Sequence, residues 1–196
     1  MRIAYIIPSL YRMAPNRVVQ QLVEGMMARG HECHVFYFDP VTTDAIAFPC
    51  RATRISLLRA TDLTGYDVVH THGLRPNLYV WIHGVPRGVR AVATIHSYVF
   101  EEFRFIYGRV LGWIFGHLFV RTLSRHDRVV SLSSDAVAHY AHWIRPSRLT
   151  YCYNSVEEPT VDVPPDADDC RRIRELKGNG VLVANICFFD KIKGLD

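Results

Sequence analysis

The sequence predicts an α/β domain, a Rossmann-like parallel sheet with helices on both faces. Short apolar runs alternate with helical patterns along most of the chain, as in successive βαβ units. The runs are continuously apolar, which is typical of strands that helices cover on both faces. Apolar residues make up 49% of the 196 residues and charged residues 21%, which excludes a disordered chain. We expect strands at 3–7, 33–38, 67–70, 91–95, 129–132 and 149–151.

The first helix is expected from about Asn16 to Arg29. Apolar residues recur there at intervals of three and four, the spacing of one buried helix face. Asn16 is suited to cap the amino end of this helix, and Gly30 can supply the left-handed residue that ends it. The apolar positions are Val18, Val19, Leu22, Val23, Met26 and Met27.

The stretch from Tyr98 to Arg125 is interpreted as one long helix or a broken pair of helices. Its apolar centre is shorter than the roughly 20 residues that a membrane span needs. We favour a core helix packed on the sheet. A second interpretation is a surface that touches a bilayer, with arginines facing anionic head groups. The arginines in question are Arg104, Arg109, Arg121 and Arg125.

The composition changes after residue 156, where an acidic, proline-rich stretch predicts a linker. A short helix from Asp169 to Lys177 and a buried strand at 180–185 are expected beyond it. A lone terminal strand needs neighbours to be stable. We therefore expect a first domain at 1–160 and, at 161–196, the linker, short helix and first strand of a truncated second domain.

The net charge and the cysteine content exclude several classes of protein. A net charge of +4 does not identify a nucleic-acid binder, and no nucleic-acid-binding motif is present. Five scattered cysteines exclude a disulfide scaffold and fit a reducing compartment. The apolar start of the chain is interrupted by Pro8 and is too short for a secretory signal. The sequence therefore predicts a cytoplasmic protein that does not bind nucleic acid.

Polar residues gather where the predicted strands end. Open α/β sheets bind ligands beyond the carboxyl ends of their strands. The first strand leads to Asn16 and Arg17 at a helix amino end, where free N–H groups favour an anion or a sugar hydroxyl. The third and fourth expected strands end at His70, His72 and His96. A histidine there can donate to a substrate oxygen or accept a proton near neutral pH.

The histidines also have two other interpretations, as packed strand residues or as metal ligands. His70 alone is more often a packed strand residue than a catalyst. The His70–His72 pair with a distant third histidine also suggests a zinc hydrolase. No metal-binding carboxylate stands near the pair in the sequence, so a metal-free site is favoured. No serine-hydrolase elbow, dinucleotide fingerprint or P-loop is present.

Together these residues resemble the amino-terminal half of a family-4 glycosyltransferase with the GT-B fold. The resemblance implies transfer of a sugar from a nucleotide-sugar donor to a glycan or lipid-linked acceptor, with retention of configuration and no cofactor or metal. It implies that this domain holds the acceptor and that a missing carboxyl-terminal domain holds the donor. The matching segments are MRIAYIIPSL, APNRVVQQLVEGMMARGHECHVF, YDVVHTHG, VRAVATIHSYVFEE, DRVVSLSSDAVAHY, LTYCYNSVE and VLVANICFFDKIKGLD.

The resemblance also implies roles for single residues. His96 corresponds to the family's catalytic-site histidine. The acceptor-binding residues it implies are Asn16, Arg17, His70 and His72, and the donor-binding residues are Asn154, Lys191 and Lys193. The chain departs from the family at two places. Cys187 and Phe188 replace a common Gly-Arg pair, with Lys191 as a substitute, and the glycine pair of the first loop is absent.

Two other functions stay open from the sequence. One is a non-catalytic binding or assembly module with the same fold, and the other is the histidine-ligated metal hydrolase. The arginine-rich helical stretch adds peripheral contact with the inner face of the membrane as an alternative to a purely cytoplasmic location.

Overall fold

The computed structural model describes residues 1–41, 43–155, 164 and 166–183. The chain divides into two compact units, Met1–Asn154 and Ser155–Asp196. The predicted boundary at 160 and 161 lies outside the described residues.

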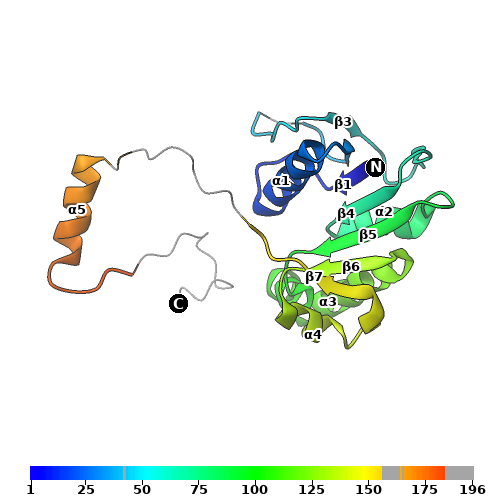
Figure 1. The fold of residues 1–196 in the computed structure, drawn as a ribbon. Coiled ribbons are helices and arrows are strands. Elements are labelled where there is room, and N and C mark those ends of the chain that lie inside the picture. The colour runs from blue at the N-terminus through cyan, green and yellow to red at the C-terminus, as the bar shows by residue number, and fades with distance from the viewer. Residues whose placement is uncertain (42, 156–163, 165, 184–196) are drawn as a thin grey trace. The chain divides into compact units, whose positions relative to one another are not determined.

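The first unit is built on a seven-stranded sheet in which all neighbouring strands run parallel. Its order is β3-β2-β1-β4-β5-β6-β7, and Figure 1 shows the strands from β3 at the top to β7 at the bottom. Six strands match the predicted runs within two residues, and β3 was not predicted. The strands are β1 Arg2–Ile7, β2 Glu32–Tyr37, β3 Arg51–Arg54, β4 Val68–His72, β5 Arg90–Ile95, β6 Arg128–Ser131 and β7 Leu149–Tyr151.

The chain reverses its direction across the sheet between β1 and β4. From β1 it moves outward to β2 and β3, and then returns to the other side of β1 and continues through β4 to β7. Right-handed crossovers then place helices on opposite faces in the two halves. The helices of this unit are α1 Ala14–Ala28, α2 Leu74–His83, α3 Val99–Thr122 and α4 Ser134–Tyr140, with short 3-10 turns at Leu123–Arg125 and Pro146–Arg148.

The core follows this division into two faces. Val19 and Val23 of α1 pack with Tyr5 on one face of β1. Ala4, the adjacent residue in the strand, packs with Tyr79 of α2 on the other face. A third cluster joins α3 and α4 to β5, β6 and β7. The prediction of a parallel sheet with helices on both faces is confirmed.

Helix α1 begins two residues earlier than predicted, and Asn16 does not cap it. Met13 occupies the cap position without a side-chain hydrogen bond. Asn16 lies inside the first turn, and its Nδ2 donates instead to the carbonyls of Ser9 and Tyr11, at 2.9 and 2.8 Å. Gly30 follows the carboxyl end of the helix with φ of 78°, as predicted.

Helix α3 is a hairpin of two helical arms, so the broken-pair interpretation is correct. Gly108 interrupts the helix with φ of 79° and ψ of 178°. The two arms, 99–107 and 109–122, run in opposite directions and pack in direct contact. A Cβ on Gly112 would lie 2.4 Å from Cα of Arg104, so only glycine permits this approach.

The second unit contains α5, Ala167–Lys177. Asp166 caps it by accepting hydrogen bonds from the amides of Asp168 and Asp169. The predicted helix is therefore present and starts two residues earlier. Residues 180–183 of the predicted strand have no regular structure, and 184 and 185 lie outside the described residues. A strand needs a paired neighbour, and the described residues of this unit include none.

Candidate functional site

The candidate site lies at the carboxyl ends of β1 and β4, where the strand order reverses. This switch point is where open α/β sheets leave a crevice for ligands, because the flanking loops turn to opposite faces. The two strand ends are close together. Gly73, directly after β4, has φ of 94°, and a Cβ there would lie 3.4 Å from Cγ of Pro8, directly after β1.

Two of the predicted histidines form a pair at this edge. A hydrogen bond of 2.9 Å joins Nδ1 of His72 to Nε2 of His96, and the ring centroids are 5.1 Å apart. His72 is only 1% exposed, whereas His96, directly after β5, is partly exposed. The convergence predicted for these two imidazoles is present. His72 lies behind His96, so only His96 is presented toward the edge.

His70 extends the row of imidazoles along the same face. Its ring centroid is 4.3 Å from that of His72, and its Nε2 is joined to Oγ1 of Thr94 at 2.8 Å. Tyr5 of the neighbouring strand stacks obliquely on His70, with centroids 5.5 Å apart. His70 is thus held between two strands.

Burial keeps these imidazoles neutral. Desolvation lowers the pKa of His96 to about 4 and that of His70 to about 3, the latter with help from the charges of His96 and His126. Desolvation, then His70 and His96, lower the pKa of His72 well below its usual value. Each ring therefore carries one donor and one acceptor at neutral pH.

The ring nitrogen of His72 that has no partner indicates which of the two histidines donates the hydrogen bond between them. Nε2 of His72 is buried and has no partner among the described residues. A buried N–H without a partner is rarer in proteins than a buried acceptor without one. We therefore assign the proton of His72 to Nδ1, which donates to Nε2 of His96. His96 then carries its own proton on Nδ1, a donor with no partner within the described part of the chain.

The loop that carries His96 is held by α4. The hydroxyl of Tyr140 donates to the Ser97 carbonyl at 2.6 Å and accepts from the Val99 amide at 2.9 Å. Tyr98 donates to Asp135 of α4 at 2.5 Å. These bonds fix the backbone on the carboxyl side of His96.

The other predicted residues occupy different environments. Asn16 is 1% exposed, and its amide holds the loop between β1 and α1. Arg17 is exposed and its Nη1 donates to Gln20. Asn154 is exposed beyond β7. Lys191 and Lys193 lie outside the described residues.

Two features of this region were not predicted. Arg75, in the first turn of α2, forms a bidentate ion pair with Asp39, two residues after the end of β2, at 2.6 and 2.9 Å. On the opposite face of β4, Thr71 is joined to His126 at 2.9 Å and donates to Asn77 at 2.6 Å. The position of Asp39 at a strand end was the available signal for the first feature. Nothing in the local sequence signals the second.

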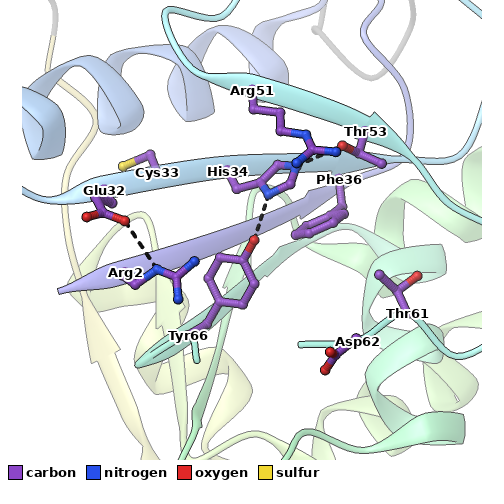
Figure 2. Close-up of a pocket in the computed structure, with 10 residues that line it drawn as sticks. All are labelled: Arg2, Glu32, Cys33, His34, Phe36, Arg51, Thr53, Thr61, Asp62 and Tyr66. Atoms are coloured by element: carbon purple, nitrogen blue, oxygen red, sulfur yellow. Dashed lines mark hydrogen bonds and ion pairs between the residues drawn. The ribbon is translucent and has the colours of Figure 1, made fainter. Parts of the chain in front are cut away.

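A separate cavity of about 460 Å³ lies at the amino ends of β1 and β2 (Figure 2). Its polar groups are largely bonded to one another. His34 is joined to the hydroxyl of Tyr66 at 2.6 Å and to Oγ1 of Thr53 at 2.8 Å, while Arg2 pairs with Glu32. The cavity is at the strand ends opposite to the histidine pair. We do not assign the site to it.

Among the residues that the structure describes, no three His, Cys, Asp or Glu side chains are grouped to hold a metal ion. In the same residues, no helix has the length and apolar character required to cross a bilayer.

Solved structures define the class of protein to which this fold corresponds. A sucrose-phosphate synthase from Thermosynechococcus elongatus matches with a TM-score of 0.63 and 16% identity, over 80% of this chain and 49% of that one. An α-glucosyltransferase in complex with UDP and DNA matches with a TM-score of 0.52 and 15% identity, over 77% and 40%. These neighbours are GT-B glycosyltransferases, and the match covers less than half of each.

Sequence comparison gives the family. Residues 15–158 match Glycosyltransferase Family 4, and the chain belongs to that family. An O-antigen biosynthesis glycosyltransferase of Escherichia coli, WclY, is 29% identical over the whole chain. The chain spans 56% of the length of that relative.

Proposed function

We propose that this chain is the acceptor-side domain of a retaining glycosyltransferase. The enzyme would transfer a sugar from a nucleotide-sugar donor to a glycan or lipid-linked acceptor, without a cofactor or metal. One observation carries the proposal: a neutral, preoriented histidine pair lies at the switch point of a family-4 fold, with His96 at the edge. The O-antigen relative supports a bacterial surface polysaccharide as the product.

His96 would act as a hydrogen-bond donor at the reacting sugar. Glycosyl transfer passes through an oxocarbenium-like transition state, so the donor and acceptor must be held in line and shielded from water. A neutral imidazole can orient a hydroxyl without placing a second positive charge beside the developing cation. The bond from His72 fixes the ring before substrate arrives, which avoids a reorganisation cost during the reaction.

The remaining predicted residues would divide between the two substrates. Arg17, exposed near the start of α1, is available to an acceptor, whereas the buried Asn16 would act by shaping the β1–α1 loop. Lys191 and Lys193 would neutralise the departing diphosphate, and Asn154 would help to hold the donor. A lipid-linked acceptor would place the enzyme at the inner face of the membrane.

The test is a transfer assay on the gene product that contains this chain. We expect His96→Ala to lower kcat about 100-fold or more, because removing one preoriented hydrogen-bond donor from an active site has an effect of that size. His142→Ala, an exposed imidazole outside the site, is the matched control. Circular dichroism establishes that both variants fold. Unchanged turnover in His96→Ala would remove this residue from the mechanism.

A second measurement separates the enzyme from a non-catalytic module. Residues 1–196 alone should transfer sugar slowly or not at all, because the chain spans 56% of the length of its relative and we propose that the donor is held by the remainder. The complete gene product should transfer sugar readily. Robust transfer by the 196-residue chain would contradict the division of labour, and acceptor binding without transfer in the complete protein would favour the module.

A further inference from the structure

The α3 hairpin carries an exposed apolar tip, which we define as residues 104–114. Every residue from 104 to 111 is exposed, and the apolar side chains come from both arms. Val110 is 72% exposed and Trp113 is 62% exposed. Apolar patches of this extent are uncommon on soluble monomers and mark interaction surfaces. The large apolar residues of the tip are Phe105, Ile106, Tyr107, Val110, Leu111, Trp113 and Ile114.

The charge within the tip has one sign. Residues 104–114 include two arginines, Arg104 and Arg109, and no aspartate or glutamate, whereas Glu101 and Glu102 precede the tip on the first arm. Arg104 and Arg109 line a hollow of about 430 Å³ together with Phe100, Val110 and Trp113. Two guanidinium groups beside an indole ring match a phosphate head group at the boundary between water and hydrocarbon.

We propose that the hairpin tip docks on a bilayer that contains anionic phospholipids. The exposed apolar residues lie on both sides of the turn at Gly108, so the end of the hairpin can enter a bilayer interface while its arginines stay among the head groups. The arginines supply the matching charge for anionic head groups. A bilayer with anionic head groups therefore accounts for both the exposed apolar side chains and the positive charge of this surface.

Docking would place the histidine pair close to lipid-linked substrates. Helix α3 begins at Val99, three residues after His96, and Tyr140 ties its first turn to the Ser97 carbonyl. This consequence rests on the proposed function. Lipid binding itself does not, because it can be measured without donor or acceptor.

The first experiment measures sedimentation of the 196-residue chain with vesicles of phosphatidylcholine, with and without phosphatidylglycerol. We expect binding to the anionic vesicles at low salt and weaker binding at high salt. Val110→Asp should weaken that binding at least about tenfold, because it places a carboxylate in the lipid interface. Leu58→Asp is the matched control, since Leu58 is 86% exposed outside the hairpin.

A second variant tests the charge without altering the apolar surface. The double variant Arg104→Gln with Arg109→Gln should lose about 25-fold in affinity for anionic vesicles, about fivefold for each arginine. Its binding to phosphatidylcholine alone should change little. Arg87→Gln, an exposed arginine outside the hairpin, is the control.

Three outcomes would overturn the proposal. They are no binding to anionic vesicles, equal binding by the tip variants and their controls, or a dimer that Val110→Asp dissociates while lipid binding is absent. The last outcome, read by sedimentation equilibrium, would assign the tip to a second copy of the chain. None of them affects the His96→Ala transfer assay, so a failure of membrane docking is distinguishable from a failure of the proposed function.

Discussion

Acidification from pH 7 to pH 5.5 should destabilise the domain strongly, because the fold holds four histidines, two buried and two partly buried, in their neutral form. Burial lowers the pKa of His96 and His126 to about 4 and that of His70 to about 3, and it places the pKa of His72 well below the usual value. In the unfolded chain the same groups titrate near 6.5. Between these values only the unfolded state binds the protons.

The sign and the magnitude of the stability change follow from the difference between the folded and the unfolded pKa values. A folded pKa below the unfolded pKa gives stability that is present above pH 6.5 and lost as the pH falls toward the folded value. By pH 5.5 each group removes slightly more than about 1 kcal/mol from the free energy of unfolding, so four remove roughly 5 kcal/mol. That loss equals the whole stability of a marginal domain.

Urea denaturation at several pH values measures the effect. The slope of the unfolding free energy against pH should correspond to an uptake of roughly three to four protons on unfolding near pH 5.5. His126→Gln should lower this uptake by about one, and His142→Gln, at an exposed position, serves as the control for losing an imidazole. A stability that stays constant from pH 7 to pH 5.5 would refute the assignment of four imidazoles that the fold keeps neutral.

Three other substitutions test the packing around the site and within the α3 hairpin. Tyr140→Phe should cost about 1–3 kcal/mol of unfolding free energy and speed hydrogen exchange of the following loop amides, because it removes a buried hydroxyl with two partners. Gly112→Val should lower the unfolding temperature markedly, because its Cβ would overlap the backbone of Arg104 in the opposite arm. Between pH 7 and pH 5.5, His72→Leu should lose about 1 kcal/mol less unfolding free energy than the original chain, measured by urea denaturation, because it removes one buried titrating group.

The strand pattern could be predicted from the sequence because buried parallel strands are continuously apolar. The same rule explains why β3, Arg51–Arg54, was missed. It lies at the edge of the sheet, three of its four residues are exposed, and its sequence has no apolar run. Its pairing with β2 depends on backbone hydrogen bonds, which leave no mark on side-chain composition.

The position of the site could be predicted from the sequence, but which of its side chains are buried could not. Strand ends are visible in the sequence, so His72 and His96 were placed on one edge. Which of the two is buried depends on the packing of neighbouring strands. Asn16 illustrates the same limit, because an asparagine before an apolar helix resembles a cap, whereas the fold uses its amide to hold a loop. His126 is 55 residues from its partner Thr71, beyond any local pattern.

The smaller loss of stability in acid that we expect for His72→Leu bears on function as well as on folding. An unpaired buried nitrogen and a suppressed ionisation both cost stability, and an apolar side chain of similar size would avoid both costs. Of the two ring nitrogens of His72, only Nδ1 has a partner among the described residues, and that bond holds His96. If His72→Leu loses less stability in acid yet lowers transfer by the complete protein, then orienting His96 is the benefit that offsets the cost. If transfer is unchanged, the pair has no role in holding His96 for reaction, and the hydrogen-bond argument for the mechanism fails.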